Sequence, residues 1–146
     1  GLGPAIKALA EDFSDRTGVN VDFQTVVFRN RLDGEAKIAM YRIAQEALTN
    51  IERHALASHV RIDLRGHKKG ATLRIEDNGR GLPDESANPT GGLGLRNMQE
   101  RVEQLEGRLR IARPRGGAGT IIEVSVPLSH LLPPEPETPN RPKVPA

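Results

Sequence analysis

The sequence contains no cysteine and no tryptophan among its 146 residues. The absence of cysteine excludes disulfide bonds, thiolate metal sites and cysteine nucleophiles. It also fits a reducing compartment, where disulfides are rare. Aromatic residues make up only 3% of the chain, so a hydrophobic core must be built from aliphatic side chains and alanine.

The sequence also lacks a strong excess of one charge and any long apolar run. The formal net charge is +2, and Lys and Arg are scattered among acidic residues, without the basic runs of nucleic-acid-binding proteins. No apolar stretch approaches the ~20 residues of a membrane-spanning helix. The chain starts at Gly1, with no initiator methionine and no basic leader. We therefore expect one domain taken from a longer protein.

What the sequence does contain is a succession of helical and strand-like patterns. Apolar residues at 3.6-residue spacing predict helices, and alternating apolar residues predict strands. The longest apolar stripe runs from Ala36 to Ala55. The expected helices are 5–16, 35–55 and 93–106; the expected strands are 19–27, 59–65, 71–77, 109–113 and 120–126, with turns at 66–70 and 114–119.

The stretch Asp77-Asn78-Gly79-Arg80-Gly81 follows the expected strand 71–77. An acidic residue before two spaced glycines suggests a carboxylate held beside a backbone that another group approaches closely, because glycine permits unusual dihedrals and close contact. Taken alone, this pattern could equally be a tight turn after a strand.

Polar residues form a second stripe on the expected helix 35–55. Glu46, Asn50 and His54 are spaced at four-residue intervals and therefore lie on one side of a regular helix. Asparagine is unfavourable in a helix interior, so Asn50 is costly unless it binds something. For Glu46 and His54 alone, a solvated helix face is the simpler interpretation.

A glycine-rich segment, Gly91-Gly92-Leu93-Gly94, leads into the expected helix 93–106. Free N–H groups at a helix N-terminus favour anions, and glycines let a phosphate come close. The segment is not a P-loop, because no Gly-Lys-Ser/Thr follows, and not a dinucleotide fingerprint, because it does not directly follow a strand. A flexible loop with glycine caps is the alternative.

Taken in order, these blocks resemble the ATP-binding domain of the GHKL superfamily, which includes histidine kinases, topoisomerase ATPases and mismatch-repair ATPases. The resemblance spans about residues 5–128 and rests on four motifs: Glu46-x-x-x-Asn50, Asp77-x-Gly79-x-Gly81, Gly92-x-Gly94-Leu95 and Gly117-x-Gly119-Thr120. Residues 42–55 and 94–102 are most similar to histidine kinases of the nitrate-sensor and desaturase-sensor type. The resemblance implies an α+β two-layer sandwich, the Bergerat fold, with helices on one face of a mixed, mostly antiparallel sheet.

The resemblance also implies roles for individual residues. Asn50 would ligate a Mg²⁺ that bridges the phosphates of ATP, and Glu46 would be the catalytic residue, acting on a water or positioning the attacking group. Asp77 would accept a hydrogen bond from the adenine amino group, with Thr120 and an ordered water as further partners. The other implied ATP-binding residues are Arg53, His54, Gly79, Gly81, Leu82, Gly92, Gly94 and Leu95; the glycines 79 and 81 would leave room for the base, and 92–95 would belong to a lid over the phosphates.

The implied function is that of the catalytic domain of a cytoplasmic two-component sensor histidine kinase, which phosphorylates a histidine on a separate dimerisation domain and thereby serves a response regulator. None of the four histidines lies in an acceptor-like context, so we expect ATP binding without self-phosphorylation. Nucleic acid and direct membrane contact are not expected. The alternatives are a GHKL ATPase, an anti-sigma-type protein serine kinase and a non-catalytic nucleotide sensor.

We expect the chain to divide into three parts. Residues 1–18 would form a helix leading in from a dimerisation domain, and 19–128 would form the ATP-binding domain. Six of the last fourteen residues, from Pro133 onward, are proline and none is aromatic. A segment of this composition buries too little apolar area to offset the entropy lost on ordering, so 129–146 is expected to be a disordered tail.

Overall fold

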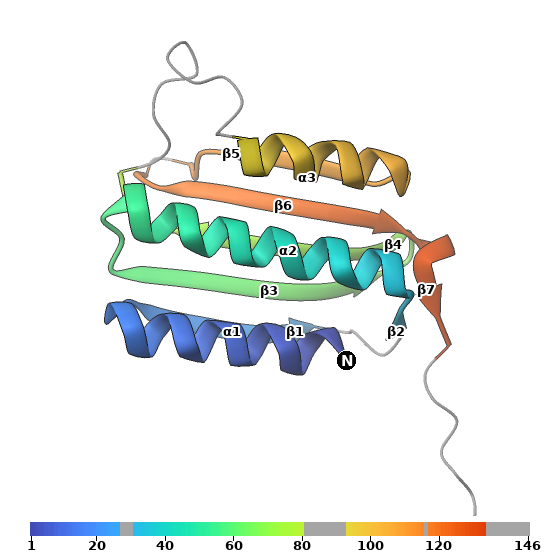
Figure 1. Ribbon diagram of the computed structural model, residues 1–146, viewed down its shortest axis with the longest axis horizontal. Coiled ribbons are helices and arrows are strands. Elements are labelled where there is room, and N and C mark those ends of the chain that lie inside the picture. The colour runs from blue at the N-terminus through green and yellow to red at the C-terminus, as the bar shows by residue number, and fades with distance from the viewer. Residues whose placement is uncertain (27–30, 81–92, 116, 134–146) are drawn as a thin grey trace, which may run out of the picture.

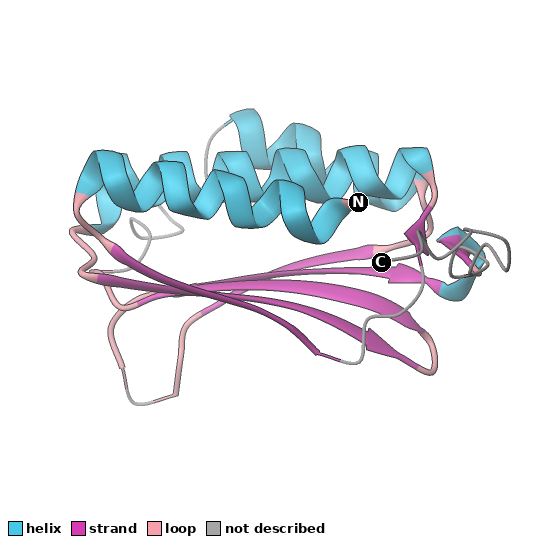
Figure 2. Ribbon diagram, turned by 90° about the horizontal axis from the view of Figure 1, so that it is seen from below, coloured by secondary structure: helices cyan, strands magenta, loops and turns pink. Residues whose placement is uncertain are grey.

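Among the described residues, three α-helices cover one face of a five-stranded sheet (Figures 1 and 2). The computed structural model describes residues 1–26, 31–80, 93–115 and 117–133. Its sheet has the strand order β1-β3-β4-β6-β5, with β1 parallel to β3 and the other neighbours antiparallel. The strands are β1 (Asn20–Val26), β3 (His59–His67), β4 (Gly70–Asp77), β5 (Arg108–Ala112) and β6 (Thr120–Pro127). The expected two-layer α+β sandwich is confirmed.

The helices α1 (Leu2–Thr17), α2 (Gly34–Asn50) and α3 (Leu93–Gln104) run side by side over the sheet (Figure 1). A glycine ends α1, because Gly18 has a φ of 75°, in the left-handed region that glycine tolerates best. Asp33 caps α2, and its Oδ1 accepts a hydrogen bond from the N–H of Ala36 at 2.9 Å. No helix among the described residues is long and apolar enough to cross a membrane.

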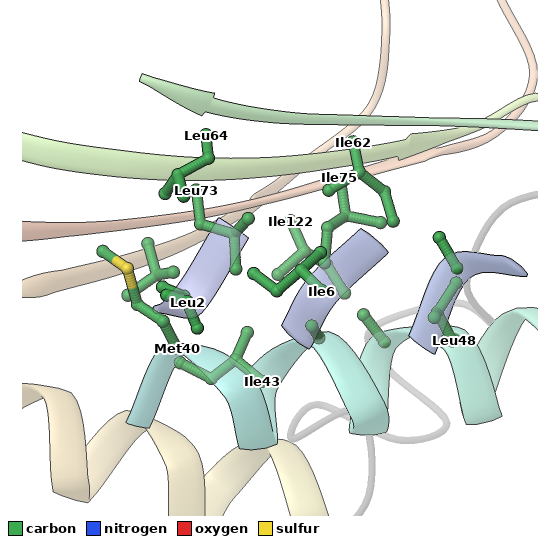
Figure 3. Close-up of a cluster of buried hydrophobic side chains, with 14 of the residues drawn as sticks. Leu2, Ile6, Met40, Ile43, Leu48, Ile62, Leu64, Leu73, Ile75 and Ile122 are labelled. Atoms are coloured by element: carbon green, nitrogen blue, oxygen red, sulfur yellow. The ribbon is translucent and has the colours of Figure 1, made fainter. Parts of the chain in front are cut away.

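The core lies between the helices and the sheet and is aliphatic, as the low aromatic content requires. Ile6 of α1 and Ile43 of α2 are fully buried and point toward the sheet (Figure 3). They meet Ile62 of β3 and Leu73 of β4, whose alternate residues face the helices. The one fully buried aromatic side chain among the described residues is Phe13 of α1.

The structure departs from the expected elements in three places. The expected helix 35–55 remains an α-helix only to Asn50 and continues as a π-helical turn, η1 (Ile51–Ala55). The expected turn at 66–70 shortens, because β3 extends to His67 and β4 begins at Gly70. A two-stranded sheet not predicted from the sequence pairs β2 (Arg31–Leu32) with β7 (Leu131–Leu132), after the 3-10 turn η2 (Leu128–His130).

The elements η2 and β7 include the first residues of the tail that was expected to be disordered from residue 129. Described structure continues to Pro133, and the carbonyl of Pro133 accepts a hydrogen bond from Arg31 Nε at 3.3 Å. Residues 134–146 of the expected tail lie outside the described residues.

Candidate functional site

The ends of several helices and strands meet at one end of the molecule, on the left in Figure 1, and these ends carry the predicted site residues. The α2 helix ends there at Asn50, β4 ends at Asp77, β6 begins at Thr120, and α3 begins at Leu93. Asp77 and Thr120 are direct partners in the antiparallel register of β4 and β6. Residues separated by more than 40 positions in the sequence are therefore assembled by the sheet.

Asp77 is a buried carboxylate, with only 5% of its surface exposed. Its Oδ1 accepts a hydrogen bond from the N–H of Gly79 at 2.9 Å. Burial raises the pKa of Asp77 above its ordinary value, and nearby Glu76 adds to this, while the N–H groups of Gly79 and Thr120 act in the opposite direction. The expected partner Thr120 thus acts through its backbone amide.

Gly119 packs directly against the backbone of Asp77. It has a φ of 115°, and a Cβ at this position would lie 2.0 Å from the Asp77 carbonyl oxygen. Only glycine can occupy such a position without displacing the end of β4. The sequence motif Gly-x-Gly-Thr contained Gly119, but its contact with Asp77 depends on the β4–β6 register and was not predicted.

We expect Gly119→Ala to lower the free energy of unfolding by about 2 kcal/mol or more, because the new methyl group meets backbone atoms that cannot rotate away. Gly117→Ala is the matched control, since its Cβ would have no neighbour closer than 3.8 Å. Urea denaturation of both variants measures the difference. Equal stability of the two variants would show that the Asp77–Gly119 packing is looser than described.

Asn50 contributes an amide that lacks a partner. Its Nδ2 atom is buried and makes no hydrogen bond to any described residue. A buried, unpaired polar group is costly, and such groups in native structures often mark a place where a ligand or ion binds. Glu46 lies one turn earlier on α2 and is half-buried, so the expected Glu46–Asn50 pair does share one side of the helix.

His54 does not continue this line as a regular helix would require. The turn after Asn50 is π-helical, which breaks the four-residue repeat, and both Arg53 and His54 are exposed. The backbone carbonyl of His54 accepts a hydrogen bond from Arg80 Nε at 2.5 Å. The π turn is thereby joined to the segment that follows Asp77.

Asn78 joins the segment after Asp77 to the start of β3, a role that the sequence did not indicate. Its Oδ1 accepts hydrogen bonds from the N–H groups of Ser58 and His59, both at 3.0 Å, and its Nδ2 donates to Ser58 Oγ at 3.0 Å. The backbone N–H of Asn78 also donates to the His59 carbonyl at 3.2 Å. Asn78 therefore fixes the direction in which the chain leaves Asp77.

The remaining predicted residues belong to the glycine-rich segments. Gly79 is buried beside Asp77, and Gly94 and Leu95 lie in the first turn of α3. Gly81, Leu82 and Gly92 lie outside the described residues. Of the predicted set, the structure thus brings Asp77, Gly79 and Thr120 into contact, and places Glu46 and Asn50 on the helix that ends at the same side.

The fold and the residues gathered at this end define a candidate nucleotide-binding domain, and comparison with known proteins identifies its family. Residues 35–130 match the family described as "Histidine kinase-, DNA gyrase B-, and HSP90-like ATPase". This match covers more than half of the chain, and the chain belongs to that family.

Two curated relatives are named histidine kinases. The chain is 38% identical over 129 residues to the signal transduction histidine-protein kinase/phosphatase DegS of Brevibacillus brevis, a match that covers 88% of this chain and 33% of that protein. It is 40% identical over 131 residues to the sensor histidine kinase MctS of Rhizobium johnstonii, covering 88% and 28%. The chain therefore spans about a third of the length of these relatives.

Solved structures agree on the fold. The histidine kinase domain of a blue-light activated histidine kinase from Erythrobacter litoralis has a TM-score of 0.65 at 27% identity, covering 88% of this chain and 61% of that one. A mycobacterial sensor histidine kinase, MprB, has a TM-score of 0.65 at 23% identity, covering 85% and 92%, and supports the fold alone.

Proposed function

We propose that this domain binds Mg-ATP and supplies the γ-phosphoryl group to a histidine on a separate dimerisation domain, as the catalytic part of a two-component sensor histidine kinase. Membership of the ATPase family and the two relatives named histidine kinases support the proposal. The observation that carries it is Asp77, a buried carboxylate with a raised pKa at the end of a strand, surrounded by glycines.

Recognition of the adenine base of ATP is assigned to Asp77. A buried carboxylate that keeps acceptor capacity suits the exocyclic amino group of adenine, a hydrogen-bond donor. The absence of side chains at Gly79, and at Gly81 beyond the described residues, would leave space for the adenine plane. Thr120 would hold the carboxylate in place through its backbone amide.

Binding of the ATP phosphates is assigned to the end of α2 and the start of α3. Asn50 fits a magnesium ligand, because its amide offers the oxygen that this hard cation prefers. Its buried, unpaired Nδ2 would donate to a phosphate oxygen beside the ion. Among the described residues no three acidic or histidine side chains gather into a metal site, so phosphate oxygens and waters would complete the shell. The ion, when bound, would neutralise charge on the transferred phosphoryl group. Glu46 would hold or polarise a water, or position the attacking group.

Other predicted residues have supporting positions. Arg53 and His54 are exposed beside the site, where they would reach the phosphates or the ribose. Gly92, Gly94 and Leu95 would form part of a lid over the phosphates, since the first turn of α3 presents free N–H groups. The segments RIAQEALTNIERHA and GLRNMQERV support assignment to the nitrate-sensor and desaturase-sensor type of kinase. A response regulator is the expected downstream partner, and the cytoplasm, where ATP is available, is the expected location.

The experiment uses the longer kinase of which this chain would be part. The protein that contains the dimerisation domain is incubated with γ-labelled ATP and magnesium, and acid-labile, base-stable label on histidine is the expected result. Label on serine would favour the anti-sigma-type kinase, and phosphate release without labelling would favour a GHKL ATPase. Calorimetry on the 146-residue chain tests the binding part separately, and an absence of binding at millimolar Mg-ATP would contradict the site assignment.

A further inference from the structure

A second polar cluster lies at the other end of the helices, on the right in Figure 1, where α2 begins and β7 ends. His130 Nδ1 lies 2.7 Å from Asp33 Oδ2, and His130 Nε2 lies 2.8 Å from the carbonyl oxygen of Leu105. Asp33 also donates its backbone N–H to the His130 carbonyl at 2.8 Å. Leu105 comes directly after α3, so one imidazole joins the first residue before α2 to the first residue after α3.

The two partners of His130 decide its protonation. A carbonyl oxygen and an ionised carboxylate can only accept hydrogen bonds, so both ring nitrogens must carry a proton for both bonds to form. This is the imidazolium form. Although burial works against the charge, the bonds to Asp33 and Leu105 and the fields of Asp33 and Glu35 leave the pKa of His130 raised. Burial likewise disfavours charge on Asp33, yet bonds from Ala36 and His130 lower its pKa.

We propose that His130 is a positioning residue for nucleotide binding, and that its cation sets the placement of α2 relative to α3. The inference rests on the proposed function, because it assumes that the far ends of these helices hold the phosphates. The two helices pack on each other, and an α-helix of 12 to 17 residues behaves as a rigid rod over this length. The His130 bridge, meaning the two hydrogen bonds that join Asp33 and Leu105 through the imidazole, would therefore fix the separation between Asn50 and Gly94 at the other end.

The His130 bridge is expected to break as the pH rises, because the imidazolium loses a proton. The charged groups that face His130 are Asp33 and Glu35, both on the first turn of α2 or its cap, and the α3 side presents the Leu105 carbonyl. The basic residue of β2, Arg31, donates to the Pro133 carbonyl. A raised histidine pKa means that the contribution is complete below the ordinary value of about 6.5 and is lost as pH rises through the folded value. The lowered pKa of Asp33 means that its contribution is present above about 3.9 and is lost as pH falls through its folded value.

The test compares the dissociation constant of Mg-ATP for the wild type and for His130→Gln across pH. Glutamine keeps a donor but cannot become a cation. We expect the variant to bind about fivefold more weakly at about pH 6 and equally well at a pH above the folded pKa of His130, where the ring has lost its charge. Because the titrations of ATP and of Asp77 affect both proteins alike, they cancel in the ratio of the two constants.

Two further variants make the test specific. Asp33→Asn keeps the helix cap but removes the carboxylate, so the pKa of His130 falls and the wild-type pH dependence should move to lower pH; this variant also carries the test if His130→Gln does not fold. His67→Gln is the control, because His67 bonds to Thr72 on the uncovered face of the sheet, and its ratio to wild type should stay near one at every pH.

The outcomes separate this inference from the proposed function. If the wild type binds no Mg-ATP at any pH, the proposed function is wrong. If the wild type binds but the ratio for His130→Gln does not change with pH, the positioning role of His130 is wrong while the nucleotide site stands. Nitrogen shifts of the His130 ring, recorded on the same samples, must show the raised pKa and its decrease in Asp33→Asn.

Discussion

Asp77→Asn is expected to weaken ATP binding about 100-fold, or about 3 kcal/mol, and to leave the fold intact. Asparagine has nearly the same shape as aspartate, but it removes the charge and turns one acceptor into a donor. At a buried position that meets the adenine amino group, a donor would face a donor. Calorimetric titration with ATP measures the loss.

The stability of the same variant provides a second, independent result. Because the pKa of Asp77 is raised in the folded protein, the folded state binds its proton more tightly than the unfolded state does. Stability therefore decreases as pH rises from below about 3.9 through the folded pKa, and above it the ionised carboxylate costs the fold free energy. Removing that charge should leave Asp77→Asn at least as stable as the wild type at neutral pH.

Glu76→Gln is the matched control for the binding measurement. Glu76 is adjacent to Asp77 but is only half-buried and pairs with Arg74 at 3.2 Å on the uncovered face of the sheet. This variant should bind ATP as the wild type does. A tenfold or greater loss in Glu76→Gln, or unchanged binding in Asp77→Asn, would show that adenine is not held by Asp77.

Asn50→Ala is expected to reduce phosphoryl transfer about 1,000-fold in a kinase that contains the acceptor domain. Alanine removes the proposed magnesium ligand, and with it the position of the ion over the phosphates. Titrations with and without magnesium distinguish this effect from that of Asp77→Asn. Asn50→Ala should lose only the part of the affinity that depends on magnesium, whereas Asp77→Asn should lose affinity under both conditions.

Stability again separates a functional residue from a structural one. The Nδ2 atom of Asn50 is buried and unpaired among the described residues, so truncation removes a destabilising group. Asn50→Ala should therefore melt at the same temperature as the wild type or higher. Thr49→Ala is the control, because Thr49 Oγ1 only bonds back to the Gln45 carbonyl at 2.9 Å, and this variant should keep its activity. A large loss of stability in Asn50→Ala would assign Asn50 to the fold.

The sequence was sufficient to predict the elements whose patterns are local. The apolar stripe of α2 and the hairpin of β3 and β4 follow from periodicity, because the core face of each element repeats in its own residues. The π turn after Asn50 was not predicted, since its residues favour a helix and nothing local distinguishes α from π. The β2–β7 pair joins residues about 100 positions apart, and two-residue strands have no period to detect.

In the candidate site, too, the features with a local sequence pattern could be predicted and those that depend on distant residues could not. Asp77 and Asn50 could be selected from the sequence because a carboxylate before glycines and an asparagine within a helix are both unusual. Gly119, Asn78 and His130 act on segments far away in the sequence, through the strand register and the meeting of chain ends. His130 lies in the segment 129–146 that the sequence predicted to be a disordered tail, although both of its ring nitrogens are bonded.

The central claim is that Asp77 recognises adenine, and competition between ATP and GTP tests it most directly. Guanine presents a carbonyl oxygen where adenine has its amino group, so the buried carboxylate would face an acceptor without a proton between them. Calorimetry on the wild-type chain with magnesium should show ATP binding at least about 100-fold more tightly than GTP. Equal affinity for the two nucleotides would contradict the assignment of Asp77.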